Sequence, residues 1–464
     1  MTHSNATIHV FRDSTTTAKE IRICVKPTAS KQVSLQAFAL GGASELQDPR
    51  DDVAFCLAGD ILRESGLLTL SGSELARLEA STGTRVFLQR HLHHRGIGGS
   101  CPRHELNLLL DMVVARLKYD PEISETVVER LKHREKQSIE AIAARSAAST
   151  AGTDETSVIR ELAFGDEEDL LKAHKMEHVA ELDSERVRQI VRRAFGRPEE
   201  STFCLIGGGL EEDADSRIPQ LLENFARRLL ANEDDAVGTS ALPRWCRVEG
   251  ELRRMNLKFR STKDRIKVVN VGRTITDKSQ AFIVFKPQDS RSLRDIPETD
   301  FLLNALCEIL RSRLIARLRT DRGEVYSVSA DYSRVALSPF TRLFVSFSCS
   351  MHSDSDIIRR AQEEIEQMAV GDFTGQEISN VLATLRSQKE RATTDSHLLF
   401  RLMDGLKMAQ GDFQVADEIA SQRMVCSYLE DEKHFQASLK RLLQGAVSNG
   451  MACLVIRHCP LEKL

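Results

Sequence analysis

The sequence contains no apolar stretch long enough to cross a membrane and no large excess of charge of either sign. Apolar segments such as Leu108–Val114 are interrupted by charged residues within two turns, whereas a spanning helix needs roughly 20 apolar residues. Lysine and arginine total 64 and aspartate and glutamate 68, so the net charge is only −4. We therefore expect no membrane span, and no overall positive field that would hold nucleic acid or an anionic membrane.

Closely paired cysteines and a secretory signal are also absent from the sequence. The ten cysteines include no CxxC pair, and several lie inside apolar runs, where a buried free thiol behaves as a small hydrophobic group. The N-terminal segment MTHSNATIHVFRDSTTT has no apolar core of the kind that a signal peptide needs. Both observations predict an intracellular protein, in the cytosol or in an organelle matrix.

The sequence does contain an ordinary globular composition and an order of elements that occurs twice. Of its 464 residues, 41% are hydrophobic and 28% are charged, which is typical of a folded chain with two or three domains. Apolar periodicity predicts a strand, a helix, two strands, several helices and a last strand in each half. The predicted elements are 33–40, 51–65, 84–92, 94–100, 103–145 with a turn at 120–121, 181–195, 201–206 and 217–230, and then 280–285, 300–318, 325–334, 341–350, 355–369, 374–391, 398–407, 417–440 and 451–458.

This order predicts an α+β fold made of two repeated sandwich domains, in which helices pack on one face of an antiparallel sheet. We expect the first domain to cover residues 1–235 and the second domain to cover residues 251–464. The segment 236–250 between them contains Gly238 and Pro243 and has the composition of a linker.

Several segments carry a resemblance to known enzymes. In the second half they are LNALCEILRSRLIARLRTDRGEVYSVSADYSR, LFVSFSC and GDFTGQEISNVLATLRSQKE; in the first half they are LQAFALGGASEL, SGSELARLEASTGTRV and AFGRPEESTFCLIGG. The former resemble the C-terminal domain, and the latter the third domain, of four-domain zinc peptidases in the pitrilysin/insulinase clan, peptidase family M16. The chain is most similar to the C-terminal half of long PQQL-like members, which implies two domains of the LuxS/MPP-like metallohydrolase fold.

The resemblance also locates a change at the position of the zinc motif. Members of the family carry HxxEH on the first helix of their first domain, where two histidines on one helix face bind the metal and the glutamate activates water. The corresponding helix here reads Phe-Cys-Leu-Ala-Gly, with Phe55, Ala58 and Gly59 in place of His, Glu and His. We expect no metal ligand or base on this segment, no zinc in this chain and no peptidase activity of the chain alone.

A literal HxxEH does occur elsewhere in the chain. On a helix it would place His174, Glu177 and His178 on one face, and the chain would then be an active zinc metalloendopeptidase. The motif lies late in the first domain, within the charged sequence GDEEDLLKAHKMEHVAELDSERVRQ. That context favours a solvated helix with surface histidines, and the metal-binding hypothesis is kept as an alternative.

Arg319 and Tyr326 match a second feature of the family, an arginine and a tyrosine between the long helix of the last domain and its next strand. The resemblance implies that they reach the catalytic half and hydrogen-bond the substrate near the scissile peptide, where a guanidinium and a phenol can stabilise the developing negative charge. The residues by themselves also fit a simpler interpretation, with Arg319 as a cation at a helix C-terminus and Tyr326 half-buried in a strand.

Together these features predict the non-catalytic, substrate-binding half of an M16-type zinc metallopeptidase. The expected partners are an unstructured peptide, bound by pairing with strand edges, and a zinc-bearing half that is either a separate subunit or an upstream part of a longer gene product. Zinc is expected in that partner. An alternative is a non-peptidase scaffold subunit, like the core proteins of respiratory complexes in the same clan.

Overall fold

The structure, a computed structural model, describes residues 6–12, 19–46, 48–91, 94–147, 174–211, 217–231, 265–272, 278–285, 296–320, 325–334, 341–371, 373–391 and 431–459. The chain divides into two compact units. Of the described residues, the first unit contains those in 6–139 and 174–231, and the second contains those in 140–147, 265–391 and 431–459. The predicted linker at 236–250 lies outside the described residues, as do the predicted helix 398–407 and most of 417–440.

The first unit is built on a six-stranded sheet. Its strands are β1 (Thr7–Arg12), β2 (Glu20–Pro27), β3 (Gln32–Leu40), β6 (Arg85–Arg90), β7 (His94–Pro102) and β8 (Thr202–Gly207). They lie in the order β1-β2-β8-β3-β7-β6, in which β3 is antiparallel to both of its neighbours and β2 runs parallel to β8. The sequence predicted the last four of these strands and missed β1 and β2.

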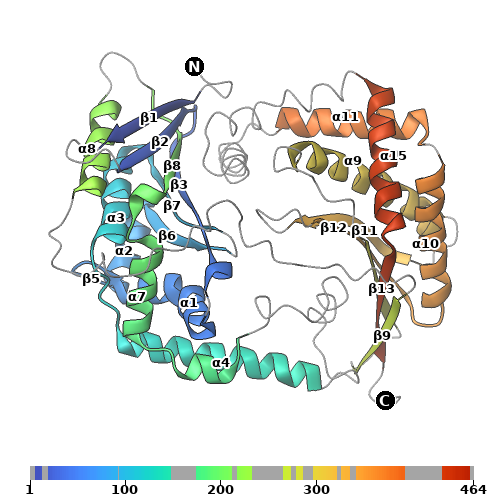
Figure 1. The fold of residues 1–464 in the computed structure, drawn as a ribbon, viewed down its shortest axis with the longest axis horizontal. Coiled ribbons are helices and arrows are strands. Elements are labelled where there is room, and N and C mark those ends of the chain that lie inside the picture. Colours follow the sequence, from blue (N-terminus) through green and yellow to red (C-terminus); the bar gives the residue numbers. More distant parts are fainter. Residues whose placement is uncertain are drawn as a thin grey trace. The chain divides into compact units, whose positions relative to one another are not determined.

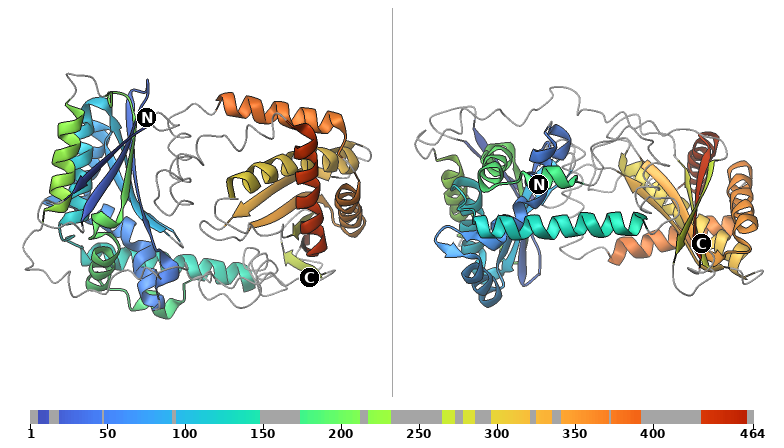
Figure 2. Two further views of the ribbon diagram at one scale, coloured as in Figure 1. Left: turned by 45° about the horizontal axis from the view of Figure 1, so that its top comes forward. Right: turned by 90° about the horizontal axis from the view of Figure 1, so that it is seen from below.

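Helices pack against this sheet and share one hydrophobic core with it. They are α1 (Pro49–Ser65), α3 (Leu106–Lys118), α7 (Ser184–Phe195) and α8 (Ile218–Leu230). Helices α3 and α8 lie side by side on one face of the sheet (Figures 1 and 2). Val33, Leu35 and Ala37 alternate along β3 and are all buried in this core, as the two-residue period of a strand requires.

Helix α1 has a defined start and a defined end. Asp48 caps the N-terminus, because its side chain accepts a hydrogen bond from the backbone N–H of Arg50 at 2.9 Å. At the other end, Gly66 has a φ of 118°, a conformation that only glycine adopts without strain. Between these ends the helix buries an apolar face formed by Val53, Ala54, Phe55, Leu57, Ala58, Ile61 and Leu62.

Three other helices contact α1 or form ion pairs with it. Helices α2 (Gly72–Thr82) and α6 (Met176–Ala180) pack against it directly. Helix α4 (Glu125–Ala147) is joined to it by ion pairs, in which Arg130 contacts Glu64 and Arg134 Nη2 lies 3.0 Å from Asp60 Oδ2. Side chains of α1 therefore meet residues that are far away in the sequence.

The second unit repeats the strand pattern of the first. Its strands are β9 (Arg265–Gly272), β10 (Lys278–Phe285), β11 (Val325–Arg334), β12 (Thr341–Ser350) and β13 (Met451–Cys459). In the order β11-β12-β10-β13-β9, strand β10 is antiparallel to both neighbours and β9 runs parallel to β13, just as β3 and β2 do in the first sheet. The predicted α+β fold of two repeated domains is confirmed.

The second unit has a hydrophobic core of its own. Its helices are α9 (Ile296–Leu314), α10 (Asp354–Val370), α11 (Gly375–Arg391) and α15 (Glu432–Ser448), labelled in Figure 1. Buried Asp354 links the start of α10 to strands β10 and β13. It accepts hydrogen bonds from Ser279 Oγ at 2.9 Å and from Arg457 Nε at 2.8 Å. Asp354 is thereby paired with a cation and a hydroxyl, as a buried carboxylate must be.

Candidate functional site

Arg319 lies where helix α9 continues into a π-helical turn, Ile315–Thr320. A π turn is wider than an α turn and is frequent at functional sites. Leu318 is buried in the core of the second unit and anchors the turn, while its neighbour Arg319 is exposed. The next residues, 321–324, lie outside the described part of the chain.

Tyr326 lies on β11, an edge strand of the second sheet as far as that sheet is described. The pairing of β11 with β12 shifts register between Val325 and Ser327, which marks a β-bulge at Tyr326. Tyr326 is 63% exposed, and Lys278 Nζ lies 4.9 Å from the centroid of its ring. The simpler interpretation, in which Tyr326 is half-buried in a strand, is therefore wrong, because Tyr326 is exposed.

Arg319 and Tyr326 thus belong to one connection, between α9 and β11, and both are exposed. The guanidinium donates several hydrogen bonds and the phenol donates one, which suits a carbonyl oxygen that gains negative charge. Substrate contact by these two residues stays a prediction, and their surroundings are compatible with it.

The helix that was expected to lack the zinc motif, α1, uses those positions for packing. Phe55 is 1% exposed and stacks on Phe195 with the ring centroids 6.2 Å apart. Ala58 is fully buried in the same core. At Gly59, an added Cβ would lie 3.2 Å from Cζ of Arg90, so the guanidinium occupies the space of a side chain. These three positions offer neither a metal ligand nor a base.

Cys56 requires a correction to the sequence-based interpretation of α1. We expected no metal ligand on this segment, but a thiolate is a good ligand for zinc. Cys56 is half-buried, and its Sγ lies 3.8 Å from Oδ1 of Asp52, one turn earlier on the helix. Helix α1 therefore presents two potential ligands beside its apolar face.

The literal HxxEH motif does not form a metal site in the way that the sequence suggested. His174 precedes α6, so it does not share a helix face with Glu177 and His178. The side chain of Glu177 is 67% exposed and lies 3.6 Å from His178 Nε2. Within the described residues, the group of side chains close enough to hold one metal ion is instead Asp52, Cys56 and His174.

His174 is enclosed by acidic groups and is not a surface histidine, since its side chain is only 17% exposed. Its Nδ1 lies 3.0 Å from Oε1 of Glu135 on α4, and its Nε2 lies 3.5 Å from Oδ2 of Asp52. Hydrogen bonds with Asp52, Cys56 and Glu135 raise the pKa of His174 to about 11, against the opposing effect of burial. Without a bound metal, His174 is therefore an imidazolium at neutral pH.

The sequence contained only part of the signal for this cluster. Asp52 and Cys56 are four residues apart, a spacing that places them on one helix face and could have been noticed. Glu135 and His174 are brought to them by the packing of α4 and of the segment before α6, and no local pattern indicates that contact.

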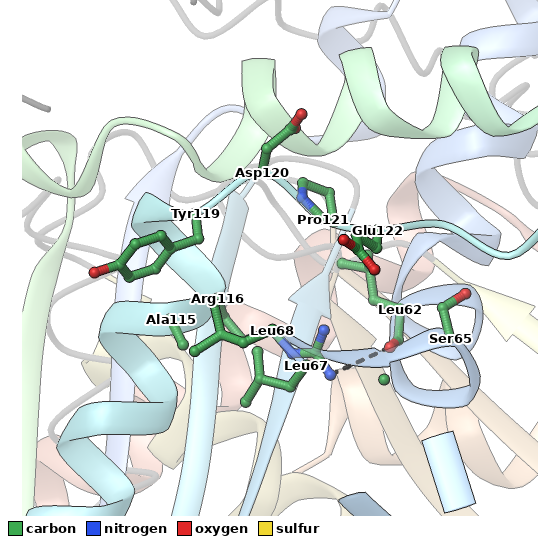
Figure 3. Close-up of a pocket in the computed structure, with 11 residues that line it drawn as sticks. Leu62, Ser65, Leu67, Leu68, Ala115, Arg116, Tyr119, Asp120, Pro121 and Glu122 are labelled. Carbon is green, nitrogen blue, oxygen red and sulfur yellow. Dashed lines mark hydrogen bonds between the residues drawn. The ribbon is translucent and has the colours of Figure 1, made fainter. Parts of the chain in front are cut away.

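Two shallow pockets lie near the C-terminal half of α1. One is lined by Leu62, Arg116, Tyr119 and Glu122 among others, and Figure 3 shows Tyr119 and Asp120 pointing outward at its rim. Arg116 donates a hydrogen bond to the carbonyl oxygen of Leu62 at 3.2 Å, and burial lowers the pKa of Arg116 to about 10. The other is lined by Gly59, Asp60, Arg63, Phe87, Arg90 and Arg116 among others. The sequence predicted neither pocket.

Comparisons with known proteins agree with this architecture. Residues 183–385 match the family model described as the peptidase M16 inactive domain. The periplasmic protease PqqL from Escherichia coli is similar in structure, with a TM-score of 0.72 and 14% identity over 99% of this chain and 47% of that chain. A peptidase M16 inactive domain from Pseudomonas fluorescens has a TM-score of 0.67 and 11% identity, over 98% of this chain and 100% of that one.

The first half of the same Escherichia coli protease, solved separately, also matches, with a TM-score of 0.67 and 14% identity over 97% of this chain and 92% of that chain. The chain thus spans about half of the length of the whole protease, and the separately solved first half of that protease shares its fold. None of the curated proteins matches the sequence. No helix among the described residues is both long and apolar enough to span a bilayer.

Proposed function

Because the chain belongs to peptidase family M16, we propose that it is the non-catalytic, substrate-binding half of an M16-type zinc metallopeptidase. The observation that carries this proposal is the burial of Phe55 and Ala58, which puts core packing where the family's motif would place a ligand and a base. The chain closes a peptide-degrading chamber with a zinc-bearing half, which is a second subunit or an upstream part of the same gene product. The catalytic zinc belongs to that half.

Arg319 and Tyr326 are the residues of this chain that contact the scissile region of the peptide. Their exposure on the connection between α9 and β11 supports this role, because a donor that acts on a substrate from another half must leave its own core. Lys278, close to the ring of Tyr326, adds positive charge at the same place. Three such donors favour an oxyanion over a neutral carbonyl.

The peptide itself is held by backbone pairing with strand edges. Within the described residues, β6 is an edge strand of the first sheet and pairs only with β7. Strand β11 is the equivalent edge strand of the second sheet and pairs only with β12. An edge strand presents a row of N–H and C=O groups to which an extended peptide can add. This mode suits an unstructured substrate of varied sequence.

The proposal is tested by isolating the chain from its source with its bound partners and measuring cleavage of an unstructured fluorogenic peptide. We expect chelator-sensitive cleavage by the complex and none by the chain alone, with or without added zinc. The variants Glu177→Gln and His178→Asn of the isolated chain form a matched pair. Both are expected to show the same absence of peptide cleavage as the unmodified isolated chain.

Two outcomes would contradict the proposal. If the chain alone cleaves the peptide and loses that activity in Glu177→Gln, the alternative of an active peptidase at His174–His178 is correct. If the complex contains no peptidase activity at all, the chain is a scaffold subunit. We propose that the chain lies in the cytosol or in an organelle matrix. The same purification identifies the compartment.

A further inference from the structure

The cluster of Asp52, Cys56 and His174 has the geometry of a metal site. Zinc held tetrahedrally at about 2.0–2.3 Å from N, O and S ligands keeps those ligand atoms roughly 3.2–3.8 Å from one another. Here Asp52 Oδ2 is 3.5 Å from His174 Nε2, and Asp52 Oδ1 is 3.8 Å from Cys56 Sγ. One ligand atom from each residue can be chosen so that all lie within 4.8 Å of one another. The three side chains are therefore close enough to share one ion after small rotations of their ligand atoms.

Glu135 adds an independent feature of a metal site. It accepts from His174 Nδ1 at 3.0 Å, which leaves Nε2 directed at Asp52 and Cys56. Histidines that bind zinc commonly donate their other ring N–H to a carboxylate in this way, because that bond fixes the tautomer and orients the ring.

We infer that Asp52, Cys56 and His174 bind one zinc ion, with Glu135 as the residue that positions His174. One thiolate, one imidazole and one carboxylate form a ligand set that favours zinc over magnesium or calcium, which prefer oxygen ligands. The fourth position is left for water. The ion joins α1 to the segment before α6, and its place in the proposed non-catalytic half departs from the expectation that this chain holds no metal.

Charge balance supports the assignment. Asp52 carries one negative charge, and Cys56 carries a second when it is deprotonated, so together they neutralise Zn²⁺ while His174 binds as a neutral ring. Each ligand atom binds in its deprotonated form, so any proton on it is released to solvent. In the competing interpretation, the imidazolium of His174 bridges Asp52 and Glu135 beside Cys56, and no metal is bound.

The test uses the full chain, freed of metal by a chelator and titrated with Co²⁺ as a spectroscopic substitute for zinc. We expect one equivalent of Co²⁺ to give a near-ultraviolet thiolate-to-metal charge-transfer band together with visible bands of tetrahedral intensity, and zinc to displace both. Cys56→Ser is expected to abolish the charge-transfer band, and His174→Gln to weaken zinc binding at least about 100-fold. Glu135→Gln is expected to weaken it about 10- to 100-fold.

His178→Asn and Glu177→Gln are the matched controls and are expected to bind as the unmodified chain does, since both lie outside the cluster. Circular dichroism shows whether each variant is folded, and Asp52→Asn provides a second ligand variant if His174→Gln is not. The inference is overturned if no charge-transfer band forms, if the band persists in Cys56→Ser, or if His178→Asn loses as much affinity as His174→Gln. None of these readouts requires peptidase activity, so failure here and failure of the proposed function are distinguishable.

Discussion

At the scale of single residues, the exposed guanidinium of Arg319 is the most direct test of substrate contact. In the complex with a zinc-bearing half, Arg319→Ala is expected to lower kcat/KM for an unstructured peptide about 100- to 1,000-fold, the effect of removing one oxyanion donor. Tyr326→Phe is expected to have the same direction, because it removes only the hydroxyl. Steady-state kinetics with one peptide measure both.

Arg317 provides the control for this prediction, because it lies on the same π turn and its side chain is also exposed. Arg317→Ala should leave kcat/KM within about twofold of the unmodified complex, since single exposed charges contribute little. Equal losses in the two arginine variants would point to a general charge effect, and no loss in either would favour the scaffold alternative.

Phe55 on α1 is a core residue of the first unit and stacks on Phe195 of α7. Phe55→Ala is expected to lower the free energy of unfolding by about 3–5 kcal/mol, because it opens a cavity between α1 and α7 in a fully packed core. Phe87→Ala is the matched control: Phe87 is 45% exposed and should cost much less. Urea unfolding followed by circular dichroism gives both values, and equal losses would mean that Phe55 is not a core residue.

At the scale of elements, the contact between α10 and the sheet depends on one buried carboxylate. Burial acts to raise the pKa of Asp354, but hydrogen bonds from Arg457 and Ser279 outweigh it and hold the pKa below its ordinary value of 3.8. A lowered folded-state pKa stabilises the protein above the unfolded pKa, and this contribution is lost as the pH falls through the folded value.

Asp354→Asn is therefore expected to lower the free energy of unfolding at pH 7 by about 3 kcal/mol, the lower end for breaking a buried ion pair because Arg457 is partly exposed. The difference from the unmodified chain should shrink below about pH 4, where Asp354 becomes protonated during unfolding. Glu366→Gln on the same helix is the control and should have a small effect, since Glu366 is exposed. A difference that does not depend on pH would contradict this account of Asp354.

Most strands and helices were predictable from sequence, but β1, β2 and α2 were missed. Strands β11 and β12 begin and end where they were expected, and the break between α3 and α4 falls beside Asp120-Pro121. Strand β1 is short and none of its residues is buried, whereas β2 was missed although Ile21, Ile23 and Val25 alternate along it and are buried. Helix α2 was missed because it depends on a capping box between Ser71 and Glu74, and only Leu75 within it is buried.

At the scale of the whole molecule, the two units contain separate hydrophobic cores. Units with separate cores can unfold in separate transitions. In calorimetry we expect Phe55→Ala to lower the temperature of one transition and Phe347→Ala, in the core of the second unit, to lower that of another. A single transition that both variants shift equally would show that the two units unfold together.

The sequence by itself determined the α+β class and the repeat of the strand order, and it placed Phe55, Ala58 and Gly59 where the family resemblance predicts HxxEH. It could do so because alternation, helical periodicity and a five-residue motif are properties of neighbouring positions. Only the tertiary structure decided that His174 lies against Asp52, Cys56 and Glu135 and away from the face of His178. The reason is physical: those contacts join residues of α1, α4 and the segment before α6, and packing alone brings such distant segments within a few ångströms.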